Sequence, residues 1–408
     1  MSRQLRPRLS RRHVLLAGAT GLIGSAGTLT AQATPDPTKT QGSGASEVGN
    51  RSPFAQLKRR PNPGRGTSST TPLHDLHGIV TPADLHFERH HAGIPAIDPA
   101  TYSLLIHGMV ERPTVFTLAD LKRFPGQSAI RFLECSGNGS RTYRPDPNAA
   151  QATLQELDGL TSCSEWTGVP LATLLREVGA SPKATWFLAE AMDAALLARS
   201  IPIAKAFDDA LVVYAQNGEP LRPAQGYPVR LFLPGFEGSA NVKWLRRIEL
   251  ATEPFMTREE TSKYTDPLPQ GSARQFSLVM DAKSIITEPA HPGRVSGPGW
   301  REIRGLAWSG RGTIAYVDVS VNGGRTWQRA QLDQPVLPKC HTRFRLPWHW
   351  SGAESLLMSR ATDETGYTQP TRAELLAVRG PGTQYHFNQI RAWRVAADGS
   401  VTLAVGAV

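Results

Sequence analysis

The stretch Phe132-Leu133-Glu134-Cys135-Ser136-Gly137-Asn138-Gly139 carries a cysteine where an apolar run ends and a loop of small residues begins. Residues 130–133 predict a strand that leads directly into Cys135. In a Gly/Asn loop after a strand, backbone N–H groups turn outward around the thiol, which suits a thiolate metal ligand or a nucleophile. The plainer interpretation is a buried and inert cysteine, which is the commoner fate of a single cysteine.

Strand-like and helix-like segments alternate on both sides of this loop, from about residue 73 to residue 254. The patterns predict strands at 102–106, 130–133 and 229–233, and short helices at 117–122 and 171–178. Thr117 is an N-cap signal for the first helix, and Gly179 ends the second. The alternation predicts a mixed α/β domain with many loops, which we place at residues 76–265.

The pattern changes from about residue 275, where short alternating segments are separated by turn residues. Residues 314–321 alternate, Asn322-Gly323-Gly324 supplies a turn, and residues 327–330 resume the pattern, so a hairpin is expected. Further strands are predicted at residues 355–361 and 373–378. We therefore expect an immunoglobulin-like β-sandwich at residues 275–395, which makes the fold class α+β.

The N-terminus has the features of an export signal. Ser10-Arg11-Arg12-His13-Val14-Leu15 sets a twin arginine before an apolar run, and Ala31-Gln32-Ala33 offers small residues for cleavage. We expect residues 1–33 to be a twin-arginine signal peptide and the mature protein to be periplasmic. Residues 34–75 are rich in Pro, Thr, Ser and Gly, and predict a flexible extension.

The composition excludes several classes of function. Hydrophobic residues make up 40% of the 408 residues and charged residues 20%, as in ordinary globular proteins. The formal charge of +10 falls to +5 without the five arginines of residues 1–33, and no nucleic-acid motif appears, so no nucleic-acid partner is expected. After residue 33 no apolar run approaches the ~20 residues of a membrane span.

The three cysteines, Cys135, Cys163 and Cys340, are too few for a disulfide framework. The sequence has no CxxCH motif, so no c-type haem attaches to this chain, and it has no Cys-rich zinc motif. Cys163 could line a site or pack in the interior, and packing is the favoured interpretation. Cys340 is expected to be structural.

Two further groups of residues are candidates for anion or cofactor binding. In Phe87-Glu88-Arg89-His90-His91 the adjacent histidines diverge on any regular element, so anion or phosphate binding by Arg89 and His91 is better motivated than a metal site. A solvated surface charge is the alternative for Arg89. Arg230 and Lys243 lie in apolar surroundings, where either a bound phosphate or a carboxylate would balance each charge.

Taken in order, these pieces resemble the sulfite oxidase family of molybdopterin enzymes over about residues 76–395. Within it they are most similar to the Sox-type sulfite/sulfane dehydrogenases, which are paired with a c-type cytochrome. The stretches that carry the resemblance are Leu85-His86-Phe87-Glu88-Arg89-His90-His91, Glu134-Cys135-Ser136-Gly137-Asn138, residues 162–169, Asn217-Gly218-Glu219-Pro220, residues 226–245, Glu260-Thr261-Ser262-Lys263-Tyr264 and Tyr385-His386-Phe387-Asn388.

The resemblance implies a role for each matching residue. Cys135 would be the thiolate ligand of molybdenum, Arg89 the arginine that binds the substrate anion, and Tyr264 the active-site tyrosine. Arg141 is the second candidate for an arginine of the substrate pocket. Contacts to the molybdopterin cofactor are implied for the following residues: Arg89, His90, His91, Cys135, Asp193, Gln225, Arg230, Asn241, Val242 and Lys243.

The implied activity is molybdenum-dependent oxidation of sulfite or of protein-bound sulfane sulfur, with electrons passing to a separate c-type cytochrome subunit. A sulfur-carrier protein and a homodimer or heterotetramer built on the β-sandwich are also implied. Gly139-Ser140 stands before Arg141 where the family has arginine next to the motif, which removes a charge near the metal ligand and favours the sulfane branch. The alternatives are a periplasmic reductase of the same fold and a non-enzymatic exported binding or scaffold protein.

Overall fold

The structure is a computed structural model that describes residues 36, 38–39, 41–62, 67–144, 146, 148–268 and 270–406. The expected signal peptide, residues 1–33, lies outside the described residues. The chain separates into two compact units, Met1–Ala55 and Gln56–Val408. The described part of the first unit contains no helix or strand, and all elements below belong to the second unit.

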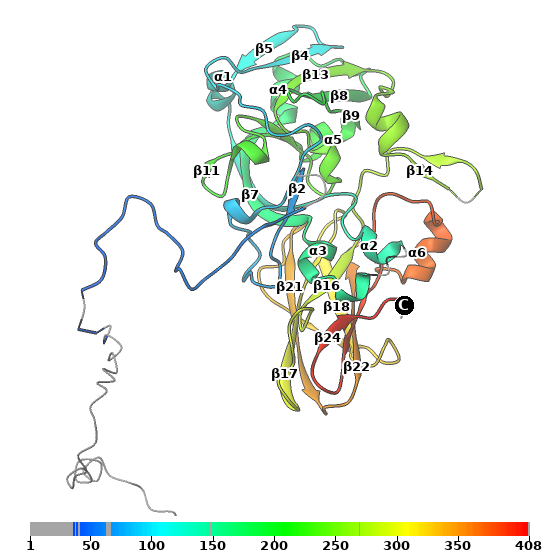
Figure 1. Cartoon of the computed structure of the whole chain (residues 1–408). Helices are drawn as coiled ribbons and strands as arrows, with labels where there is room; N and C mark the ends of the chain where they lie inside the picture. Colours follow the sequence, from blue (N-terminus) through cyan, green and yellow to red (C-terminus); the bar gives the residue numbers. More distant parts are fainter. Residues whose placement is uncertain are drawn as a thin grey trace, which may run out of the picture. The chain divides into compact units, whose positions relative to one another are not determined.

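Two five-stranded sheets form the predicted mixed α/β domain (Figure 1). The strand order of one sheet is β5-β4-β13-β8-β9; in the other it is β11-β10-β7-β6, with β12 paired to β10. Only the β4–β13 pair is parallel among these strands. The strands are β4 (Ser103–Gly108), β5 (Thr114–Thr117), β6 (Gln127–Glu134), β7 (Thr161–Pro170), β8 (Trp186–Ala191), β9 (Ala198–Pro202), β10 (Leu211–Gln216), β11 (Glu219–Pro220), β12 (Arg230–Phe232) and β13 (Leu245–Ala251). The three strands predicted in this domain are confirmed.

Short helices connect these strands. The Thr117 hydroxyl accepts a hydrogen bond from the backbone of Asp120, whose carboxylate accepts from the Thr117 backbone, so a capping box starts α1 where a helix was predicted. The helix predicted at 171–178 is α4. The helices are α1 (Leu118–Arg123), α2 (Ser140–Tyr143), α3 (Leu154–Asp158), α4 (Leu171–Glu177) and α5 (Ile203–Asp208), with helical turns η1 (Ala83–Leu85), η2 (Ala149–Gln151), η3 (Pro223–Gln225), η4 (Gly238–Ala240) and η5 (Glu259–Lys263).

A small third sheet corrects the expected boundary of the N-terminal extension. Strands β1 (Arg60–Pro61), β2 (Ser68–Thr70) and β3 (Glu88–Arg89) pair antiparallel, and Ser68 lies opposite Arg89. Leu73 is 1% exposed and packs in the hydrophobic core. Residues 68–75 are therefore part of the folded unit, although their composition predicted a flexible segment, because strand pairing and one buried leucine hold them.

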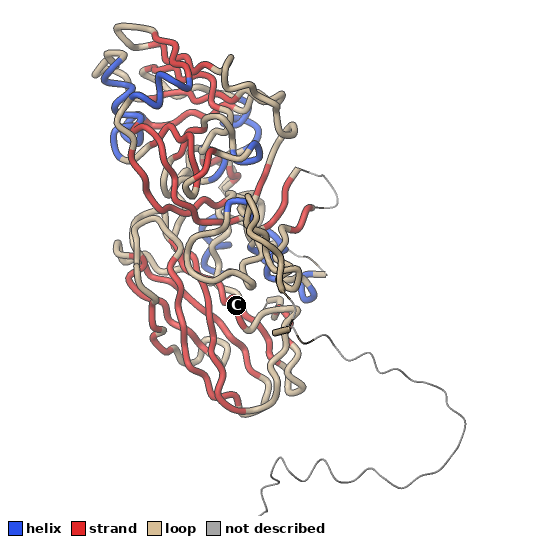
Figure 2. Tube along the Cα trace, turned by 90° about the vertical axis from the view of Figure 1, so that its left-hand side faces the viewer, coloured by secondary structure: helices blue, strands red, loops and turns tan. Residues whose placement is uncertain are grey.

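The C-terminal part is the predicted β-sandwich, and its long strands are plain in Figure 2. One sheet has the order β16-β17-β21-β20 and the other β19-β18-β22-β23-β24. The strands are β16 (Lys283–Glu288), β17 (Gly299–Trp308), β18 (Ile314–Ser320), β19 (Gln328–Arg329), β20 (Gln331–Leu332), β21 (Thr342–Trp350), β22 (Ser355–Asp363), β23 (Ala392–Val395) and β24 (Val401–Leu403). The β18–β19 hairpin is confirmed, and the sandwich continues past residue 395 into β24. Strands β14 (Asp266–Pro267) and β15 (Ala273–Arg274) precede it.

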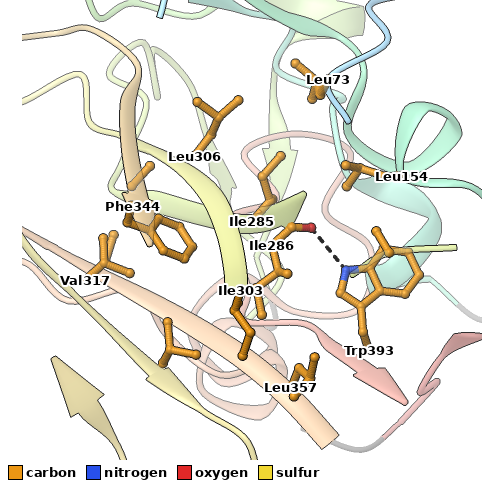
Figure 3. Packing of buried hydrophobic residues seen from close by; sticks show 14 of the residues in the cluster. Leu73, Leu154, Ile285, Ile286, Ile303, Leu306, Val317, Phe344, Leu357 and Trp393 are labelled. Carbon is orange, nitrogen blue, oxygen red and sulfur yellow. Dashed lines mark hydrogen bonds between the residues drawn. The ribbon is translucent and has the colours of Figure 1, made fainter. Parts of the chain in front are cut away.

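The core of the sandwich continues into the mixed α/β domain. Figure 3 shows Ile285 and Phe344 from one sheet packing toward Val317 and Leu357 from the other. Leu154 of α3 lies in the same cluster, as does Leu73. A shared apolar core means that the two domains cannot separate without exposing it to water.

One predicted strand is wrong. Residues 373–378 lie in helix α6 (Arg372–Arg379), where the Thr371 hydroxyl accepts from Glu374 N and the Glu374 carboxylate accepts from Thr371 N. This Thr-x-x-Glu capping box outweighs the apolar run that suggested a strand. Among the described residues no helix is long and apolar enough to cross a membrane.

Candidate active site

One cavity collects almost all of the predicted site residues. Its lining includes Arg89, His90, His91, Cys135, Asp193, Gln225, Arg230, Asn241, Lys243 and Tyr264. Apolar side chains that no sequence motif indicated, among them Phe87, Leu133, Leu197 and Trp244, complete the wall. Ligand sites of this kind combine an apolar lining with a few convergent polar groups.

Cys135 occupies the first position after β6, in a tight turn. Its N–H donates to Leu160 O at 2.9 Å, and its carbonyl accepts from Asn138 N at 2.9 Å. On the facing side, a Cβ at Gly238 would lie 3.3 Å from the Cα of Cys135, so only glycine leaves this space open. Burial raises the pKa of the Cys135 thiol, and a hydrogen bond from the Gly137 backbone together with the Arg89 charge opposes this only in part. Binding of a metal would favour the thiolate.

Arg89 and the two histidines come from β3 and the loop after it. The Arg89 guanidinium donates to His90 O. The two ring nitrogens of His90 are engaged, Nε2 with Glu88 Oε2 at 2.9 Å and Nδ1 with Lys243 Nζ at 2.7 Å. His91 Nε2 lies 3.3 Å from the Tyr264 hydroxyl. Burial, helped by the nearby Arg89 charge, lowers the pKa of His91 to about 4, so its ring is neutral at pH 7.

Lys243 and Arg230 form the basic floor of the cavity, where burial, helped by the Arg230 charge, lowers the pKa of Lys243 well below its ordinary value. Lys243 Nζ also donates to Arg89 O at 3.1 Å and to Ala224 O at 3.0 Å. Arg230 donates to Gln225 O at 3.1 Å and Asn241 O at 3.0 Å, while its buried Nε has no hydrogen-bond partner among the described residues. Burial lowers the pKa of Arg230 to about 9, which leaves it charged at pH 7. An uncompensated buried cation favours an anionic ligand here.

These groups fit a phosphate-bearing cofactor that carries a metal. Gly226 has φ +106°, and a Cβ there would lie 3.1 Å from the Cβ atoms of both Arg230 and Lys243, so glycine keeps the floor accessible. Within the described ranges, no three His, Cys, Asp or Glu side chains form a group that could hold a metal ion.

Tyr264 lies above a buried group of charges that the sequence did not indicate. The Arg199 guanidinium carbon is 4.6 Å from the centre of the Tyr264 ring, and the Tyr385 ring centre is 4.8 Å from it. Burial raises the pKa of the Tyr264 phenol, which therefore stays protonated and able to donate a hydrogen bond at pH 7.

Arg199, Glu237, Glu260 and His386 are named here the Arg199 cluster. Arg199 donates to Glu237 at 2.7 Å and to Glu260 at 2.8 Å, and His386 Nε2 lies 3.0 Å from the other Glu237 oxygen. Glu237, Glu260 and His386 belong to stretches that carried the family resemblance, which could have identified them. Arg199 lies in no motif, so nothing in the sequence distinguished it from a surface arginine.

Two predicted residues do not reach the cavity. Arg141 Nε donates to Asp146 at 2.8 Å, and Arg141 lines a separate hollow with Gly137 and Gly139. The two residues inserted before it place Arg141 on α2, beyond the turn of Cys135. Val242 is fully buried in the apolar core, so its side chain supports the floor without lining the cavity.

The other two cysteines pack against each other. Cys163 of β7 and Cys340, which precedes β21, are buried, and their sulfur atoms lie 3.3 Å apart. The favoured interpretation of Cys163 as a packing residue agrees with this position, and Cys340 likewise packs between the domains.

Comparisons with known proteins match the two domains separately. Residues 91–259 match the family "Oxidoreductase molybdopterin binding domain", and residues 274–392 match "Mo-co oxidoreductase dimerisation domain". In the solved structure of the sulfane dehydrogenase SoxCD from Paracoccus pantotrophus, one chain is 43% identical, with a TM-score of 0.85 over 91% of this chain and 99% of that one.

Curated relatives extend the comparison. Mitochondrial sulfite oxidase of Mus musculus is 30% identical over 329 residues, which are 74% of this chain and 60% of that protein. An inducible NADH nitrate reductase of Glycine max is 32% identical over 349 residues, 75% of this chain. The chain spans 39% of the length of that nitrate reductase.

Proposed function

The chain belongs to the sulfite oxidase family of molybdopterin oxidoreductases, and from this we propose that it oxidises sulfane sulfur carried on another protein. Its cofactor is molybdenum-molybdopterin. When bound, this group supplies the two-electron oxidation and the transfer of oxygen to sulfur. Electrons leave to a c-type cytochrome on a separate chain.

Each polar group of the cavity has a task in this proposal. Cys135 holds the molybdenum, and Arg230 with Lys243 balances the charge of the cofactor phosphate. Arg89 binds the anionic end of the substrate through its planar fork of N–H groups. Tyr264 is kept protonated by burial, so its hydroxyl can donate a hydrogen bond to the bound substrate, and neutral His91, 3.3 Å away, can hold that hydroxyl in place.

The position of Arg141 is the observation that carries the choice of substrate. Its charge is held away from the cavity by Asp146, with Glu156 at 4.0 Å. The Lys243 ammonium group already makes three hydrogen bonds to neighbouring residues, so Arg89 is the residue whose charge would contact the substrate. The apolar side chains of Phe87, Leu133 and Leu197 line the same cavity. With Arg230 and Lys243 assigned to the cofactor phosphate, Arg89 is the one cation among the described cavity residues that is left for the substrate. A single cation beside apolar side chains suits a singly charged persulfide better than the sulfite dianion, whose oxygens need several donors.

Parallel assays of the molybdenum-loaded protein test this choice. Sulfite, thiosulfate and a carrier protein bearing a persulfide would each be offered with oxidised cytochrome c, and cytochrome reduction would be followed. We expect kcat/KM for the carrier to exceed that for sulfite by at least about tenfold, a difference of 1.4 kcal/mol. Sulfite turnover at equal or higher efficiency would contradict the proposal. Sulfoxide reduction with a chemical reductant would instead favour the reductase alternative.

The proposal includes the cellular setting. The twin arginine suggests export to the periplasm, where cytochrome c and sulfur carriers are met, and the matched dimerisation domain supports a homodimer or a heterotetramer with the cytochrome. Replacing Arg11 and Arg12 by lysine should leave the protein in the cytoplasm, because a receptor reads the arginine pair. Normal export of that variant, detected by cell fractionation, would contradict this route.

A further inference from the structure

A second buried group of charges lies directly behind the turn of Cys135. Lys283, Arg391, Glu134 and Asp158, named here the Lys283 cluster, are at most 9% exposed in their side chains. Lys283 Nζ lies 2.8 Å from Glu134 and 3.3 Å from Asp158, and Arg391 pairs with Asp158. The cations belong to the β-sandwich side and the carboxylates to the molybdopterin domain. Figure 1 shows the elements that meet here, α2 and α3 beside β16.

The cluster is bonded to the turn itself. Glu134 is the residue before Cys135, and its carboxylate accepts from Asn138 Nδ2 at 2.9 Å and Trp308 Nε1 at 2.7 Å. Asn138 in turn donates its backbone N–H to Cys135 O, and its own carbonyl accepts from Lys283 at 3.3 Å. Both ends of the turn that presents the thiol are thus held by one lysine of the β-sandwich.

Charge explains why a lysine is needed at this place. A thiolate at Cys135 adds a negative charge next to the Glu134 carboxylate, in an interior where like charges repel strongly. Lys283 and Arg391 balance Glu134 and Asp158, so the thiolate meets no uncompensated carboxylate. Gly139, with φ +94°, leaves the space that the Arg391 guanidinium occupies.

We propose that Lys283 is a positioning residue for the metal ligand, so that the β-sandwich completes the molybdenum site in addition to any role in dimerisation. This rests on the proposed function, in which Cys135 holds the molybdenum. Outer residues that orient a metal ligand typically contribute about 10- to 100-fold in metal affinity or activity. We expect Lys283→Met to fall in that range.

The test compares variants of the full-length protein that are produced with the cofactor. Molybdenum per chain would be measured by mass spectrometry, and the g-values of the Mo(V) signal by electron paramagnetic resonance. Lys283→Met should lower the molybdenum content and shift the g-values of the loaded fraction. Lys339→Met is the matched control, because Lys339 pairs with Asp209 across the same domain boundary at 2.5 Å without touching the turn. It should keep wild-type g-values.

A double variant separates positioning from folding. Glu134→Gln with Lys283→Met removes both charges, so its melting temperature should return toward that of the wild type while the g-values stay shifted. Wild-type g-values in this variant would overturn the proposal. Cys135→Ser tests the proposed function separately. If Cys135→Ser keeps the wild-type Mo(V) signal, Cys135 is not the metal ligand and the proposed function fails. If Cys135→Ser loses that signal while Lys283→Met keeps wild-type molybdenum content and g-values, only the positioning role of Lys283 is refuted.

Discussion

The Lys283 cluster and the Arg199 cluster lie behind two groups that share the cavity, Cys135 and Tyr264, but they are built differently. The first is made across the domain boundary, with its two cations on one side and its two carboxylates on the other. The second keeps Arg199 and both of its glutamates within the mixed α/β domain and takes only His386 from the other side. The metal side of the cavity therefore depends on domain docking, while the tyrosine side is largely self-contained.

Cys135→Ser should have the largest effect, because it removes the group that the Lys283 cluster positions. An alkoxide is a poorer ligand for this metal than a soft thiolate, and its proton is harder to remove. We expect turnover and molybdenum content to fall to background while the melting temperature stays near that of the wild type. Cys163→Ser and Cys340→Ser serve as controls and should keep most activity; an inactive Cys340→Ser would indicate that the two neighbouring thiols form a disulfide that the protein needs.

Arg199→Met tests whether the second cluster is self-contained. Two buried carboxylates would lose their cation, and breaking a buried pair costs about 3–5 kcal/mol. Thermal unfolding should show a large loss of stability, and Arg199→Lys should recover part of it. If Arg199→Met loses stability but the fraction that still binds the cofactor shows normal Mo(V) g-values, the contrast with Lys283 becomes sharper. A negligible loss of stability would mean that water reaches the two carboxylates and solvates them without Arg199.

Acidity should weaken the Arg199 cluster through Glu237. Burial alone would raise the pKa of this carboxyl, but Arg199 and His386 hold it at about 2. A carboxyl with a lowered pKa stabilises the fold fully above its unfolded pKa of about 4.5, and this contribution of about 3 kcal/mol is lost as the pH falls toward 2. The stability difference between wild type and Glu237→Gln should shrink over that interval; a constant difference would contradict the assignment.

Arg89→Gln should reduce substrate use without disturbing either cluster. Loss of a charge-assisted contact costs about 1.5–3 kcal/mol, which corresponds to about one to two orders of magnitude in kcat/KM. Molybdenum content and melting temperature should barely change, and Arg89→Lys should recover only part of the loss because a point charge cannot reproduce the fork. Loss of the cofactor from Arg89→Gln would mean that Arg89 holds the cofactor instead of the substrate.

Arg141→Gln should have the smallest effect. Its ion pair with Asp146 is partly exposed, and such pairs contribute about 0.2–1 kcal/mol. Because Arg141 lies outside the cavity, kinetic measurements should show a change in kcat/KM of less than about fivefold, or about 1 kcal/mol. A loss as large as that of Arg89→Gln would mean that Arg141 enters the cavity during turnover.

The sequence predicted the parts of the site whose residue types are unusual in their context. Cys135 after a strand, and Arg230 and Lys243 among apolar residues, were recognisable because a thiol or a charge in such places needs a partner. Arg199 and Lys283 were not recognisable, since only the folded chain shows that they are buried. Whether Arg141 enters the cavity could not be predicted, because two inserted residues change where a side chain lies without changing its type.

The fold was predictable where one local signal dominated. The capping box at Thr117 and the Asn322-Gly323-Gly324 turn gave the expected helix and hairpin. At α6 the apolar run of residues 373–378 by itself predicts a strand, whereas the capping box of Thr371 and Glu374 starts a helix. The pairing of β2 with β3 could not be predicted from residues 68–70, because a short strand is stabilised mainly by the strand with which it pairs.

The division of the Lys283 cluster between two domains has a consequence for how such chains can recombine. A gene exchange that joined this molybdopterin domain to a foreign β-sandwich would bring Glu134 and Asp158 against whatever residues stood at positions 283 and 391. Unless both arrived as cations, the hybrid would carry buried carboxylates without counter-charges. Functional hybrids within this family should therefore inherit the carboxylates of the molybdopterin domain and the cations of the β-sandwich together.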